Sequence, residues 1–148
     1  MKIAARLNAA LFASLFAFAG CTVASPPGCG MESVYSTTGP DGKTTELRLD
    51  FDALARMPAW TPGNSDPPLS VAKASQLALA WGKHRYRRYD DVRIAEILLT
   101  SAGCRQTSPR WYYRVQFRPM MEGNGVLGYD QFVAVLMDGT IVEPTRKP

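Results

Sequence analysis

The sequence predicts an α+β domain in which one main helix packs on an antiparallel sheet. Three observations predict this fold class. An amphipathic stretch at about 70–88 has helical spacing, several shorter segments are β-prone, and turn residues separate these segments. With 148 residues, the chain is long enough for one domain and hardly long enough for two. Because a single helix covers a single apolar face of a sheet, we expect two layers.

A β-hairpin is expected at 32–51, before the helix. Its two β-prone halves flank 39–43, where a proline and an Asp-Gly pair favour a chain reversal. Apolar and charged residues alternate over 46–51, so one face of the second strand is predicted to be buried. The following residues, 51–57, favour a short helical turn that Pro58 ends.

The main helix is predicted to begin after Ser70, a good N-cap residue, and to run to about residue 88. Its apolar residues recur every three or four positions, as in a helix with one buried face. They are Val71, Ala74, Leu77, Ala78 and Trp81. Gly82 weakens the helix by about 1 kcal/mol. The proline-rich segment 58–68 is predicted to be a loop whose Trp60 packs on the domain.

A meander of three to four strands is expected after the helix, at 92–101, 111–118, 129–137 and 140–143. The last two join through Asp138-Gly139, a strong hairpin signal. The segment 111–118 alternates most clearly, which predicts a strand with one covered face. The residues assigned to the core are Trp111, Tyr113, Val115 and Phe117, and those assigned to the outer face are Tyr112, Arg114, Gln116 and Arg118.

Over about 51–144 the chain resembles the small exported PepSY-like domains. An alanine-rich helix opens at 67–70, a strand of the form W-Y-x-V-x-F lies at 111–117, and a closing hairpin carries Asp138-Gly139-Thr140. The resemblance implies a two-layer domain that acts as a binding or inhibitory module in the cell envelope. It maps no functional residue onto this chain, because its motifs are structural.

The first twenty residues, 1–20, are interpreted as a secretory signal peptide. Lys2 and Arg6 precede an apolar run that is shorter than the ~20 residues of a transmembrane helix. The run ends at Phe18-Ala19-Gly20-Cys21, which resembles the lipobox of bacterial lipoproteins, although that family usually has Leu where Phe18 stands. The resemblance implies that Cys21 is lipidated and becomes the first mature residue. Thr22, and not an acidic residue, follows the cysteine, which resembles the sorting of Gram-negative lipoproteins to the periplasmic face of the outer membrane.

Ordinary signal cleavage, for example after Ala24, is the alternative, and it would leave a soluble periplasmic or secreted protein. In either case residues 21–30 are predicted to be a flexible tether rich in proline and glycine. Residues 31–148 then form the single α+β domain. If Cys21 is lipidated, Cys29 and Cys104 remain, and an exported protein can pair them. Such a disulfide would add about 4 kcal/mol in the chain-entropy model, and the alternative is two free thiols.

No cofactor, metal or catalytic site is expected. The G-x-G-x-x-G pattern at 123–128 lacks the strand–helix context of a dinucleotide site, which favours a glycine-rich hairpin loop. His84 is the only histidine and has no zinc-ligand spacing around it. The paired carboxylates at 50 and 52 and at 90 and 91 are assigned to a strand edge and to a solvated loop. The serines lack a nucleophile motif. We therefore expect a protein that is not an enzyme.

Positive charge concentrates at 81–118, where nine Lys and Arg stand against three acidic residues. The candidate contact residues for an anionic partner are Lys83, Arg85, Arg87, Arg88, Arg114 and Arg118. In an exported protein, anionic lipid or an acidic protein is the expected partner rather than nucleic acid. The alternative is a solvated face that aids solubility.

Together these observations predict a non-enzymatic, lipid-anchored cell-envelope protein that binds a protein or an anionic surface. Two other functions stay open. The domain could be a structural accessory of an envelope complex, or a soluble secreted enzyme without a recognisable motif.

Overall fold

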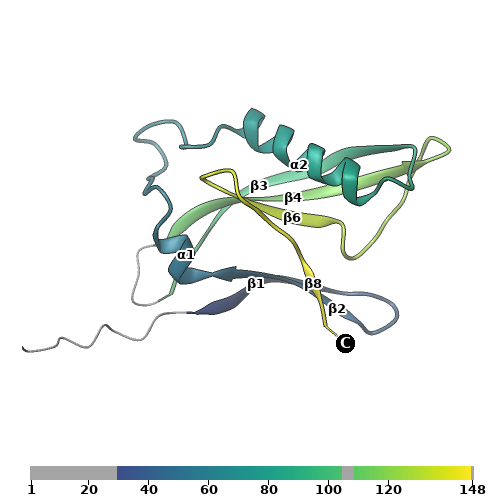
Figure 1. The fold of residues 1–148 in the computed structure, drawn as a ribbon, viewed down its shortest axis with the longest axis horizontal. Coiled ribbons are helices and arrows are strands. Elements are labelled where there is room, and N and C mark those ends of the chain that lie inside the picture. The colour runs from purple at the N-terminus through teal and green to yellow at the C-terminus, as the bar shows by residue number, and fades with distance from the viewer. Residues whose placement is uncertain (1–29, 105–108, 148) are drawn as a thin grey trace, which may run out of the picture.

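The computed structural model describes residues 30–104 and 109–147. Helix α2 (Val71–Arg85) covers one face of a larger antiparallel sheet, and a smaller antiparallel sheet covers the other face (Figure 1). The α+β class with antiparallel sheets agrees with the sequence. The arrangement differs in having three layers rather than two. The predicted signal peptide, Cys21 and the tether up to Cys29 lie outside the described residues.

The larger sheet holds most of the predicted meander. Its strands, in spatial order, are β3 (Asp91–Ala102), β4 (Arg110–Met121), β6 (Phe132–Leu136) and β7 (Ile141–Val142), while β5 (Asn124–Gly125) pairs with the end of β4. The smaller sheet contains β1 (Met31–Thr38), β2 (Thr44–Asp50) and β8 (Thr145–Arg146). The predicted hairpin at 32–51 is therefore confirmed, and the short C-terminal strand β8 extends it.

Capping side chains fix both helices at the predicted places. The short helix α1 (Phe51–Ala55) begins at Asp50, whose carboxylate accepts hydrogen bonds from the backbone N–H groups of Asp52 at 2.9 Å and Ala53 at 3.2 Å. Helix α2 begins at Ser70, whose hydroxyl oxygen accepts from the N–H of Lys73. It ends at Arg85, three residues before the predicted end.

One core lies between α2 and the larger sheet. Ala74 and Ala78 of the predicted stripe are fully buried there, whereas Leu77 and Trp81 are partly buried. Val71 is 48% exposed, so its assignment to the stripe is wrong. It occupies the first turn of α2. The residues predicted to face the helix from β4 do so: Tyr113, Val115 and Phe117 are buried in this core, and Trp111 packs at its edge.

A second core fills the opposite face of the larger sheet, and it corrects the prediction of an outer face on β4. Tyr112 is only 3% exposed and packs with Leu47 and Leu49 of the hairpin. The guanidinium of Arg114 lies 4.0 Å from the centre of the Tyr35 ring. The hairpin buries its own apolar face by covering this side of the sheet, because an isolated two-stranded hairpin is only marginally stable in water.

Trp60 packs on the domain as expected. Its ring meets that of Trp111 edge to face with 5.5 Å between the centroids. Its indole N–H donates to the carbonyl of Ser65 at 2.9 Å, which closes part of the proline-rich loop.

Candidate functional site

Four of the predicted contact residues gather where α2 ends and the chain turns into β3. This basic cluster consists of Lys83, Arg85, Arg87 and Arg88, and all four residues are exposed. Cations are favourable in the last turn of a helix, because the carbonyl end of the helix dipole is negative. Within the described part of the chain, none of the four cations takes part in an ion pair.

Two tyrosines hold the basic cluster on the domain. The guanidinium of Arg88 lies 5.0 Å from the centre of the Tyr89 ring and donates to the Tyr89 hydroxyl at 3.0 Å. The guanidinium of Arg85 lies 5.8 Å from the centre of the Tyr86 ring. Tyr86 itself is 7% exposed and packs against Phe117 in the first core. Aromatic rings thus support two of the four cations, Arg85 and Arg88.

Tyr86 is a neutral hydrogen-bond donor at the base of the cluster. Its hydroxyl donates to the carbonyl of Asp130 at 3.1 Å. Burial raises the pKa of the Tyr86 phenol well above its usual range, and the nearby Asp130 carboxylate adds to this effect. The phenol therefore stays protonated at neutral pH and does not reduce the positive charge of the cluster.

Two surface depressions adjoin the cluster. The first has a volume of about 500 Å³ and is lined by Arg85, Tyr86, Arg87, Arg88, Tyr89, Asp130 and Gln131. The second, of about 380 Å³, is lined by Lys83, Tyr86, Arg87, Tyr89, Asp90, Asp91 and Val92. The lining of the first depression combines three arginines with two aromatic rings and the buried polar residue Gln131. It suits an anionic group better than a purely apolar one.

Asp90 and Asp91 are engaged by other groups. The Asp90 carboxylate accepts from the N–H of Glu122 at 2.6 Å, which ties the start of β3 to the turn after β4. The Asp91 carboxylate accepts from the N–H of Val92 and pairs with Arg93 at 3.3 Å. These two contacts hold the pKa of Asp91 below its ordinary value. The pair therefore fixes the local structure at the start of β3.

The structure does not bring Arg114 and Arg118 to the cluster. Arg114 lies beneath the hairpin, where its side chain is 19% exposed and pairs with Glu96 at 3.7 Å, so its assignment to a contact surface is wrong. Arg118 is exposed, but it lies opposite Arg93 on the neighbouring strand and lines a separate depression of about 560 Å³. Sequence reasoning missed Arg93 as its neighbour, because only the strand register reveals that pair.

The other candidate residues have structural surroundings. Asp50 caps α1, and His84 is exposed in the last turn of α2. Among the described residues, no group of three His, Cys, Asp or Glu side chains lies close enough to hold a metal ion. In the glycine-rich segment 123–128, Gly123 lies in the turn between β4 and β5 with a positive φ of 77°, and the next two residues form β5. A strand rather than a helix follows its first residue, as a hairpin loop requires.

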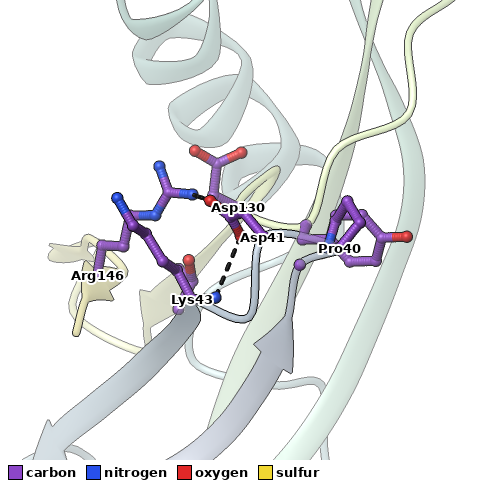
Figure 2. A pocket seen from close by; sticks show the side chains of 8 residues that line it. Pro40, Asp41, Lys43, Asp130 and Arg146 are labelled. Atoms are coloured by element: carbon purple, nitrogen blue, oxygen red, sulfur yellow. Dashed lines mark hydrogen bonds and ion pairs between the residues drawn. The ribbon is translucent and has the colours of Figure 1, made fainter. Parts of the chain in front are cut away.

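A smaller depression of about 310 Å³ lies beside the turn of the β1–β2 hairpin (Figure 2). Arg146 donates to one carboxylate oxygen of Asp41, and the N–H of Lys43 donates to the other at 3.1 Å. Two of the charges at this depression, those of Asp41 and Arg146, thus neutralise each other, and their ion pair joins the C-terminal strand to the hairpin.

Cys104 is partly buried against the second core, near the end of β3. Its predicted disulfide partner, Cys29, lies outside the described residues, so the pairing stays a prediction. The next residue, Gly30, accepts a hydrogen bond from the N–H of Phe51 at 2.9 Å. Phe51 belongs to the same core as Cys104. Gly30, the neighbour of Cys29 in sequence, and Cys104 are therefore both attached to the second core.

No family model, curated protein or solved structure matches this chain. Neither helix in the described ranges is long and apolar enough to cross a membrane.

Proposed function

We propose that the protein is a non-enzymatic, lipid-anchored module of the cell envelope that binds an anionic surface through the basic cluster. One observation carries the proposal: four exposed cations, none of them in an ion pair within the described residues, lie together at one end of the domain, and tyrosine rings support two of them, Arg85 and Arg88. Each Lys or Arg close to an anionic bilayer contributes about 1 kcal/mol, so four of them suffice for measurable binding.

The anchor is the second part of the proposal. The lipobox resemblance at 18–21 supports lipidation of Cys21 and attachment to the periplasmic face of the outer membrane. Each buried CH₂ group contributes about 0.8 kcal/mol, so several acyl chains hold a protein far longer than one. We expect Cys21→Ser to move the protein from the membrane fraction to the soluble fraction. An acyl-free mature mass for the unaltered protein would contradict this part of the proposal.

A PepSY-like domain is the third part. The alanine-rich helix α2, the W-Y-x-V-x-F strand β4 and the Asp-Gly turn between β6 and β7 follow one another in the order of that family's motifs. This order supports the proposal. The resemblance starts at residue 51, so the β1–β2 hairpin that covers the second face lies outside it.

Vesicle binding tests the proposed function. The mature chain from residue 22 onward, exported without acyl chains, is mixed with vesicles of phosphatidylcholine alone or with added phosphatidylglycerol. We expect binding only to the anionic vesicles, with a loss of tenfold or more for R87E/R88E. The matched control is R56E/K73E, which changes the net charge equally at exposed positions outside the cluster. Equal losses for both variants would show that net charge alone, and not the cluster, determines binding.

A further inference from the structure

The basic cluster and the point where the tether joins the domain lie at opposite ends of the larger sheet (Figure 1). The cluster immediately precedes β3, which starts at Asp91. At the other end of β3, Ala102 pairs with Arg110, whose guanidinium donates to the carbonyl of Ala55 in α1 at 3.2 Å. The first residue of α1 in turn binds Gly30, the last residue of the predicted tether. The whole length of β3 therefore separates the cluster from the tether.

The lengths of β3 and of the tether decide which surface the end of the domain can reach. The 12 residues of β3 span about 40 Å, since a strand rises ~3.3 Å per residue. Fully extended, the part of the tether before Gly30, residues 21–29, reaches about 30 Å. If the cluster touched the anchoring membrane end-on, Gly30 would stand a full strand length, about 40 Å, from that membrane. The extended tether reaches only about 30 Å. End-on contact is therefore open only to a surface on the other side.

Charge does not pull the tether end of the domain toward an anionic membrane. Around Gly30 and α1, the exposed or partly exposed charged residues include both signs in equal number. They are Glu32, Arg48, Asp50, Asp52, Arg56 and Arg110. The concentrated positive charge lies at the far end, so the molecule is electrostatically polar along its long axis.

We infer that the basic cluster binds phosphate head groups of an anionic surface that faces the membrane holding the anchor. This inference rests on the proposed function and specifies its partner. The depression of about 500 Å³ has the size of a small-molecule site and is bounded by three arginines. A guanidinium presents two N–H groups that match two phosphate oxygens. Gln131, which is 6% exposed, adds a buried amide to the lining.

A head group fits this depression better than an acidic peptide does. Seven residues, all within 85–89 or 130–131, line the depression, whereas a bound peptide needs an extended groove. The Asp130 carboxylate is the one acidic group in its lining and opposes anion binding there. Asp130→Asn should therefore strengthen binding about threefold or more, without changing the backbone carbonyl that Tyr86 uses.

A vesicle-tethering experiment tests the inference with the intact lipidated protein. Donor vesicles of phosphatidylcholine carry the protein through its acyl chains, and fluorescent acceptor vesicles contain phosphatidylglycerol or phosphatidylcholine only. We expect the donors to capture the anionic acceptors alone. R87E/R88E should lower capture at least tenfold, D130N should raise it, and R56E/K73E should leave it within about twofold.

A second set of donors separates this inference from the proposed function. These donors also contain phosphatidylglycerol, so the cluster can choose between its own membrane and the acceptor. Persistent capture supports the inference. Loss of capture, with binding of the unlipidated chain to anionic vesicles intact, would overturn the inference and leave the proposed function standing. Absence of anionic binding in every format would overturn both. Stronger inhibition by poly-glutamate than by polyphosphate of equal charge would overturn the phosphate assignment.

Discussion

At Gly82 the helix α2 lies close against the larger sheet. A Cβ atom at this position would lie 2.9 Å from Cε1 of Phe117 and 3.3 Å from a methyl group of Val92. Phe117 is 2% exposed and packs against Trp81 and Tyr86, so its ring has little room to move. The residue that weakens the helix by its propensity thus permits the close packing that holds the helix on the sheet.

Gly82→Ala should lower the free energy of unfolding by about 1 kcal/mol. Overpacking costs roughly 1–3 kcal/mol, and the better helix propensity of alanine returns about 1 kcal/mol. Urea unfolding of the purified protein measures the difference. Ala72→Gly, at an exposed position of the same helix, gives the propensity term alone. A gain in stability for Gly82→Ala equal to the loss for Ala72→Gly would show that Phe117 yields without cost.

Tyr86 makes stability depend on alkaline pH. Its folded-state pKa is raised by burial, so in the folded protein the phenol stays protonated above pH 10, where the unfolded phenol ionises. The stability that the neutral phenol provides is full below pH 10 and is lost as the pH rises through the folded-state pKa. The difference in free energy of unfolding between the unaltered protein and Tyr86→Phe should therefore decrease between pH 9 and pH 11. Tyr112 and Tyr113 also have raised pKa values. Both tyrosines are present in the unaltered protein and in Tyr86→Phe, so their effect cancels in the difference. A constant difference across this range would contradict the assignment.

The β1–β2 hairpin is the element that the sequence placed least well. Its strands and turn could be predicted, because alternation and the Asp-Gly pair are local signals. Its position could not. The second face of β4 carries Arg114, Gln116 and Arg118 beside Tyr112, and this pattern indicates a solvated face. The structure covers Arg114 because the Tyr35 ring and Glu96 satisfy its charge.

The candidate site also has one part that could be predicted from the sequence and one part that could not. The basic cluster could be predicted, because it is continuous in sequence and follows a helix. The supporting roles of Tyr86 and Tyr89 and the separation of Arg118 depend on packing and register, which no local pattern reveals.

Leu47→Ala should lower the free energy of unfolding by about 2–5 kcal/mol, because it leaves a cavity between the hairpin and the larger sheet. Leu47 is fully buried, whereas Leu98 on β3 is 40% exposed. Leu98→Ala is therefore the matched control. It should lower the free energy of unfolding by less than about 1 kcal/mol, because surface substitutions typically have small effects. Chemical unfolding compares the two. Similar losses would mean that the hairpin does not contribute a core of its own.

At the scale of the whole molecule, two sheets and a helix are joined by contacts between distant parts of the chain. Lys147 pairs with the nearly buried Glu46 at 2.6 Å, which secures the C-terminal strand to the hairpin. Arg110 binds α1 from the start of β4. The predicted disulfide would add a covalent link between the beginning of the domain and the end of β3, close to this contact.

We expect reduction of the mature protein to lower its free energy of unfolding by about 4 kcal/mol, because the Cys29–Cys104 bond would close a long loop. Unfolding curves with and without reductant, alongside intact masses after thiol labelling, measure this. The C29S/C104S variant should match the reduced protein and be insensitive to reductant. Two labelled thiols at these positions before reduction would contradict the pairing.

Strand β6 has a consequence for the unfolded chain. Its residues, Phe132–Leu136, are all buried, because the strand contributes side chains to both cores. With Met137 they form six consecutive apolar residues without a charge or a proline, which is the composition of segments that assemble into amyloid-like fibrils. Asp130 and Asp138 flank the segment as gatekeepers against such assembly. The strand that joins the two cores is thus also an aggregation hazard when the chain is unfolded.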